Sequence, residues 1–155
     1  MLSSGSGSGQ SASESSRANL SYPRAKNAWV RDFTNITAWQ RAHALLLLIE
    51  CAVADYPKTE RFELVSQTTR ATRSIGANIA EGAGRRTASD FARFVRMAAG
   101  SCNEVENHLI VGRDLRFLSE DAWNSLSSEL RVVRAMLTRL AQVLERDPGT
   151  PGDTG

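Results

Sequence analysis

The feature that most constrains the fold of this chain is a helical spacing of apolar residues through residues 33–146, where the only proline is Pro57. Apolar side chains recur at steps of three and four, the repeat of an α-helix, and do not alternate as in a β-strand. The clearest series comprises Trp123, Leu126, Leu130, Val133, Leu137, Leu140 and Leu144. The sequence therefore predicts an all-α domain.

Four helices are predicted, beginning near Thr37, near Arg61, at Thr87 and after Ser119. Thr87 and Asp90 form a capping box at the start of the third helix, and the glycines at 82 and 84 are available to end the second. Because the connections are short, consecutive helices should run in opposite directions. The expected architecture is an antiparallel, up-down-up-down four-helix bundle.

The two ends of the chain differ in composition from the helical region. Residues 1–32 open with a serine- and glycine-rich tract that lacks the apolar surface needed to offset its ordering entropy, so we predict a flexible leader. Residues 147–155 contain two prolines and three glycines and are predicted to be a disordered tail. The bundle domain is expected to span residues 33–146.

Composition argues against several classes of function. No run approaches the roughly 18 consecutive apolar residues of a membrane span, so no membrane association is expected. Cys51 and Cys102 lie in helical patterns, where they should pack as small apolar side chains, and are too few for a disulfide scaffold. A reducing, cytoplasmic location is therefore predicted. His43 and His108 have no metal-site spacing and no hydrolase or nucleotide-binding motif occurs, so no metal, cofactor or enzymatic activity is predicted.

The first helix carries more apolar surface than one core can absorb. Five consecutive apolar residues, from Leu45 to Ile49, surround its axis. The predicted core face is Trp39, Ala42, Leu46, Ile49 and Val53. The remaining leucines, with apolar residues beside the seam of the fourth helix, predict self-association through Leu45, Leu47, Leu48, Val132 and Met136. A wide core helix in a monomer is the alternative.

Polar residues on the second helix predict an internal polar layer, because buried polar groups need partners. Arg70 or Asn78 would pair with Glu104 of the third helix. The members of this layer are Gln67, Arg70, Asn78 and Glu104. The alternative is a small enzyme site using Glu104 and Asn78, which would require an unfilled polar pocket inside the bundle that contains both residues.

Basic residues are mostly arginines, 17 of 19, and are unevenly distributed. Residues 61–100 contain seven arginines and three acids, whereas residues 101–130 contain two arginines and six acids. Arg85 and Arg86 precede a helix N-terminus, where free amides and guanidinium groups favour phosphate. The predicted contacts with RNA or DNA backbone are Arg73, Arg85, Arg86, Arg93 and Arg96. The alternatives are solvation, pairing with Glu81 or Asp90, and an acidic protein partner.

Four blocks of sequence carry a family resemblance: FTNITAWQRAH, YPKTERFELVSQTTRATRSIGANIAEGAGRRTASDFARF, AAGSCNEVENHL and DLRFLSED. The most specific parts are Trp39 with Gln40, the SI..NIAEG of residues 74–82, Arg85, and the GS..E of residues 100–104. Over essentially residues 33–145, the chain resembles the bacterial four-helix bundle protein family, also called the 23S rRNA intervening-sequence protein family.

The resemblance implies an antiparallel bundle that assembles into a homopentameric ring and has no known enzymatic activity. The fold is also similar to the accessory variability determinant of diversity-generating retroelements, which binds nucleic acid and a reverse transcriptase. A scaffold for a reverse transcriptase is therefore the alternative to direct nucleic-acid binding. Arg116 departs from the pattern, because relatives tend to have glycine there. A left-handed arginine would cost about 1 kcal/mol, unless the helix ends differently.

Overall fold

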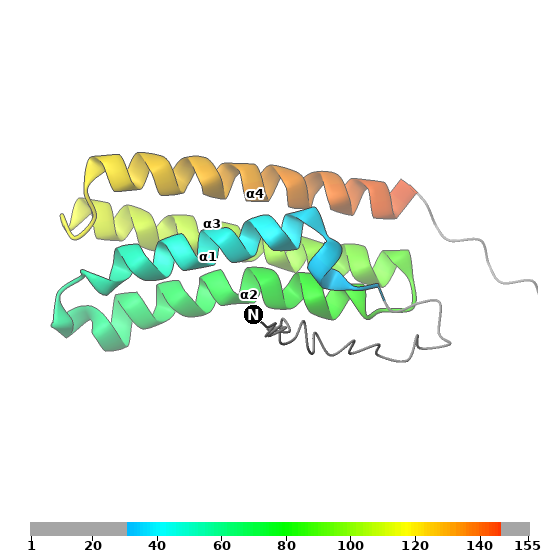
Figure 1. Cartoon of the computed structure of the whole chain (residues 1–155), viewed down its shortest axis with the longest axis horizontal. Coiled ribbons are helices and arrows are strands. Elements are labelled where there is room, and N and C mark those ends of the chain that lie inside the picture. Colours follow the sequence, from blue (N-terminus) through cyan, green and yellow to red (C-terminus); the bar gives the residue numbers. More distant parts are fainter. Residues whose placement is uncertain (1–30, 147–155) are drawn as a thin grey trace, which may run out of the picture.

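The computed structural model describes residues 31–146, which form helices and no strand. Its four long helices are α1 (Thr37–Ala54), α2 (Ser66–Ala83), α3 (Ala88–Asp114) and α4 (Glu120–Arg146). They lie side by side as a bundle (Figure 1), which confirms the predicted all-α fold with four helices. Apart from Arg31 and Asp32, the predicted leader and tail lie outside the described residues.

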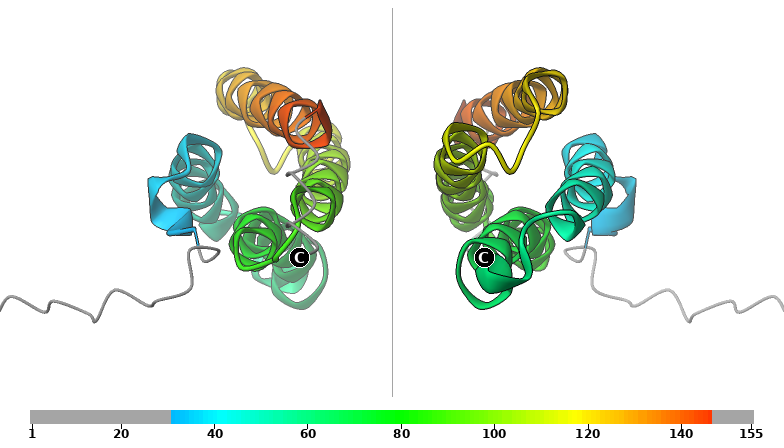
Figure 2. Two further views of the ribbon diagram at one scale, coloured as in Figure 1. Left: turned by 90° about the vertical axis from the view of Figure 1, so that its right-hand side faces the viewer. Right: turned by 90° about the vertical axis from the view of Figure 1, so that its left-hand side faces the viewer.

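The four helices are arranged around a common centre, as the end-on views show (Figure 2). Their buried apolar side chains form one core. The most extensive contacts join α2 to α3 and α3 to α4, while α1 makes fewer contacts with α2 and α4. The α2–α3 turn, the start of α1 and the end of α4 lie at the same end of the bundle (Figure 1). No helix within the described range is long and apolar enough to cross a membrane.

The core face of α1 differs from the predicted one by a small rotation. Its buried residues are Ala38, Ala42, Leu45, Ile49 and Val53, whereas Trp39 and Leu46 are only half-buried. Leu45 is 1% exposed within the subunit, so its predicted place at an interface between copies is wrong. Four consecutive leucines fit more than one helical stripe, and the observed stripe is the one that includes the alanines at 38 and 42.

The start of α2 is irregular, although a regular helix was predicted from Arg61. After Pro57, a 3-10 turn (Lys58–Glu60) is followed by one stretch of π-helix (Arg61–Val65). The Phe62 side chain, which lies in this stretch, is exposed. The regular helix therefore begins only at Ser66.

The α2–α3 connection shows one half of the predicted capping box. The Thr87 hydroxyl accepts a hydrogen bond of 3.1 Å from the backbone N–H of Asp90. Neither glycine of this turn has a left-handed conformation, and α2 ends at Ala83. Gly82 instead permits close packing, since a Cβ atom there would lie 2.6 Å from Cδ2 of Phe91 and 2.8 Å from Cβ of Phe94.

The α3–α4 connection contains the left-handed arginine that the family resemblance raised. Arg116 has φ 61°. The N–H of Phe117 donates to the carbonyl of Gly112 at 2.8 Å, and the N–H of Arg116 donates to that of Arg113 at 2.9 Å. This is a Schellman ending with arginine at the position that favours glycine, at a conformational cost of about 1 kcal/mol.

Alanine substitutions of two helical glycines should have opposite effects on stability. Gly82→Ala should lower the free energy of unfolding by about 1–3 kcal/mol, because the added methyl group overpacks the α2–α3 contact. Gly100 lies exposed in α3 with nothing within 4 Å of a Cβ built there. Gly100→Ala should therefore raise the free energy of unfolding by about 0.5–1 kcal/mol. Urea denaturation measures both, and effects of the same sign would contradict the packing role of Gly82.

Candidate nucleic-acid interface

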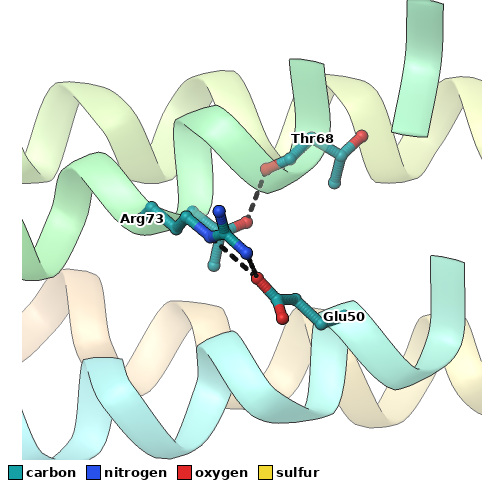
Figure 3. Close-up of polar contacts among 4 residues, drawn as sticks. Glu50, Thr68 and Arg73 are labelled. Carbon is teal, nitrogen blue, oxygen red and sulfur yellow. Dashed lines mark hydrogen bonds and ion pairs between the residues drawn. The ribbon is translucent and has the colours of Figure 1, made fainter. Parts of the chain in front are cut away.

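Two of the five arginines predicted to contact nucleic acid join helices to one another. Arg73 of α2 donates from Nη2 and Nε to Oε1 of Glu50 in α1, at 2.7 and 2.9 Å (Figure 3). Arg96 of α3 forms a bidentate pair with Glu145 of α4, at 2.8 and 2.7 Å. Because both guanidinium groups already face a carboxylate, these two arginines add little net charge for a polyanion.

The other three predicted arginines form a turn cluster, made up of Arg85, Arg86 and Arg93, at the α2–α3 connection. The Phe94 ring lies near two of their guanidinium groups, with its centroid 4.7 Å from Cζ of Arg85 and 4.9 Å from that of Arg93. Arg85 also pairs with Glu81, as the alternative interpretation anticipated. Among the described residues, Arg86 has no ion-pair partner. The turn cluster is basic, but part of its charge is neutralised.

The predicted internal polar layer is wrong. The side chains of Gln67, Arg70 and Glu104 are exposed, and Asn78 donates to the carbonyl of Ser74 in its own helix. The polar link between α2 and α3 is a hydrogen bond of 2.6 Å between the hydroxyls of Ser74 and Ser101.

The buried face of α2 explains this difference. It includes Thr68, Ala71, Thr72 and Ile75, and none of the residues of the predicted layer. The Thr68 hydroxyl donates to the carbonyl of Leu64. The Thr72 hydroxyl donates to the carbonyl of Thr68 (Figure 3). Both hydroxyls are thus satisfied by carbonyls of the preceding helical turn and need no polar partner from α3. Glu104 lines an open groove of about 200 Å³ with Gln67 and Arg70, but without Asn78. Because Glu104 is exposed and its groove does not include Asn78, the structure does not bring together the two residues that the enzyme alternative uses.

A second basic surface, absent from the sequence predictions, lies along α4. Arg131, Arg134, Arg139 and Arg146 line a shallow trough together with Thr138 and Gln142; we call these six residues the α4 arginine face. No acidic residue of the described range lines this trough. At the rise of an α-helix, successive positions at 131, 139 and 146 lie about 12 and 10.5 Å apart along the axis.

One member of the α4 arginine face is anchored to α3. Nη1 of Arg134 donates to Oε2 of Glu106 at 2.7 Å and to Oδ1 of Asn103 at 2.8 Å. The hydrogen bond from Arg134 lowers the pKa of Glu106 below its usual value, against the opposing effect of partial burial. Arg131, Arg139 and Arg146 make no ion pair with any described residue. Their charges are therefore available to an outside anion.

The two cysteines occupy different environments. Cys102 is buried close to Arg134, and burial raises the pKa of its thiol to about 12. Cys51 is exposed on α1. The prediction that both pack as small apolar side chains is confirmed for Cys102 and wrong for Cys51.

The α4 arginine face was missed because charge was counted in blocks that stopped at Leu130. The sequence nevertheless contained a signal for it. The seam from Trp123 to Leu144 defines the buried side of α4, and the positions on the opposite side hold arginines at 131, 139 and 146. The positions of these arginines opposite the seam therefore predict the α4 arginine face.

The fold and this surface define a helical-bundle protein with an arginine-rich exterior. A family model of the 23S rRNA-intervening sequence protein matches residues 34–139, which include α1, α2, α3 and most of α4. The chain therefore belongs to the 23S rRNA-intervening sequence protein family, as its sequence blocks indicated. No curated protein matches the sequence.

Glu106→Gln should destabilise the protein in a pH-dependent manner. Because the folded-state pKa of Glu106 is lowered, its ionised form stabilises the fold above the unfolded-state pKa, and this contribution disappears as the pH falls through the folded-state value. At pH 7 the loss should be below about 1 kcal/mol. It should start to shrink as the pH falls towards the unfolded-state pKa of about 4.3 and vanish only below the lowered folded-state pKa. Urea denaturation at several pH values measures it; a pH-independent loss would contradict the ion pair.

Proposed function

We propose that this protein is a non-enzymatic, self-associating, cytoplasmic bundle that binds the phosphate backbone of RNA. The observation that carries the proposal is the α4 arginine face, in which Arg131, Arg139 and Arg146 make no ion pair with any described residue and no acid lines the trough. Guanidinium groups form bidentate hydrogen bonds with phosphate and keep their charge at any physiological pH. The family description refers to 23S rRNA, which favours RNA over DNA as the ligand.

The turn cluster serves as a secondary contact in this proposal. Arg85 is paired with Glu81, so an incoming phosphate must compete with that carboxylate. Arg86 and Arg93 are exposed beside the N-terminus of α3, where phosphate is favoured. Contacts of this kind do not read base sequence.

Replacing arginines of α4 should weaken RNA binding at every sequence. For Arg131→Ala/Arg139→Ala/Arg146→Ala, log K against log salt should become shallower by about 2–3, since each lost phosphate contact contributes about 0.7–0.9. Arg85→Ala/Arg86→Ala should have a smaller effect. Fluorescence anisotropy with mixed-sequence RNA at rising salt measures both. The control is Arg61→Ala/Arg70→Ala, which removes two exposed arginines from outside the α4 arginine face.

Unchanged affinity and salt dependence of the α4 variant, with retained helical content, would contradict the proposed site. An equal loss in the Arg61/Arg70 control would show that binding depends on total charge alone.

We further infer that copies of the chain associate through an apolar strip on α1 and α4, formed by Leu47, Leu48, Val132 and Met136. Leu47 is 53% exposed, Leu48 50% and Val132 40%, although large apolar side chains normally avoid water when they are clustered. The number of copies, five in a ring, comes from the family resemblance. Such a ring would bring five α4 arginine faces to one polyanion and raise its avidity.

The ion pairs between α3 and α4 support the antiparallel arrangement within each subunit. Arg96 pairs with Glu145, whereas Glu106, further along α3, pairs with Arg134, which comes earlier in α4. The partners therefore run in opposite orders along the two helices.

Leu47→Ser/Leu48→Ser should convert the assembly to a single chain of 16.9 kDa. The substitutions remove apolar side chains that are half exposed in the subunit, so helical content should be retained. Native mass spectrometry measures the number of copies. Leu115→Ser is the matched control, because Leu115 is equally exposed but lies in the α3–α4 turn. A monomeric unsubstituted chain would overturn the inferred strip.

A further inference from the structure

The form of RNA that fits the α4 arginine face can be inferred from its shape and composition. We propose that this surface binds double-helical RNA, with the arginines on phosphates and with Thr138 and Gln142 on ribose 2′-hydroxyl groups. The proposal rests on the proposed function and names the ligand of the same site.

The arginines form a straight and rigid row. Their backbone belongs to one uninterrupted α-helix, and the positions from 131 to 146 extend over about 22 Å of its axis. The helix cannot bend to follow a flexible strand, because Leu130, Val133 and Leu137 are fully buried beneath it. A rigid row is complementary to a rigid duplex, whose two strands together also present more phosphate per unit length than one strand.

The α4 arginine face offers no surface on which bases can stack. Proteins that bind single strands combine positive charge with exposed aromatic side chains. The trough of α4 is lined by arginine, alanine, threonine, glutamine and valine only, among the described residues. Phe94, which lies beside the turn cluster, is half-buried and has the guanidinium groups of Arg85 and Arg93 beside its ring. Paired bases, which remain stacked on each other, require no such platform.

Two neutral polar residues between the arginines provide contacts suited to RNA. The Thr138 hydroxyl donates to the carbonyl of Arg134 at 3.0 Å, and its oxygen can still accept a hydrogen bond from an outside hydroxyl. Gln142 is exposed one turn further along and can both donate and accept. The shallow minor groove of an RNA duplex displays 2′-hydroxyl groups between two rows of phosphates. A DNA duplex lacks these hydroxyl groups.

The test compares three probes of the same mixed sequence and length with the full chain at fixed salt: an RNA duplex, single-stranded RNA and a DNA duplex. The RNA duplex should bind most tightly. Thr138→Val/Gln142→Ala should lose about tenfold in affinity for the RNA duplex, as expected for two lost hydrogen bonds. The same variant should keep its affinity for the DNA duplex.

A matched control and the possible outcomes distinguish a wrong ligand from a wrong function. Thr59→Val/Gln67→Ala removes the same side chains from exposed positions outside α4 and should leave all three affinities unchanged. Equal or tighter binding of single-stranded RNA or of the DNA duplex would overturn the duplex RNA inference while leaving backbone binding intact. A preference for duplex RNA that survives Thr138→Val/Gln142→Ala would overturn the role of these two residues. If none of the three probes bound, the proposed function itself would be contradicted.

Discussion

Burial of the apolar seam of α4 is the constraint on which the arrangement of the molecule depends. Leu130, Val133 and Leu137 are inaccessible to solvent, so the helix cannot rotate about its axis without exposing them. The arginines on the opposite side are therefore held outward by the same packing that stabilises the core. The pairs Arg96–Glu145 and Arg134–Glu106 then fix α4 on α3, which makes the exposed face rigid.

Arginine serves two different purposes in this protein, and their separation determines which surface is available to a ligand. Arg73 and Arg96 form ion pairs with carboxylates of neighbouring helices, which neutralise their charge. Exposed ion pairs of this kind contribute little stability individually, but they orient adjacent helices. Along α4, by contrast, acidic partners are absent from most of the face. The net charge of +2 therefore conceals a strong local excess of positive charge.

Local sequence signals predicted the helices and the threonine cap, because both depend on residues close together in the chain. The rotation of α1 could not be predicted, since Leu45 and Leu46 are chemically equivalent and their burial depends on what α2 and α4 place opposite them. The ion-pair partners were also beyond reach, because Glu50 lies 23 positions from Arg73, and Glu145 lies 49 positions from Arg96. The sequence could therefore not show which arginines pair with a carboxylate and which do not. This is why it did not distinguish Arg73 and Arg96 from the unpaired arginines of α4.

The contrasting environments of the two thiols have a practical consequence. Cys102 is buried in the core, and its thiol ionises only in strongly alkaline solution. It should therefore not react with thiol-modifying reagents at neutral pH. Cys51 is open to solvent on α1, the helix that also carries the exposed leucines. A spectroscopic label can therefore be attached at Cys51 without an engineered cysteine, and it would lie on the helix that carries the exposed Leu47 and Leu48.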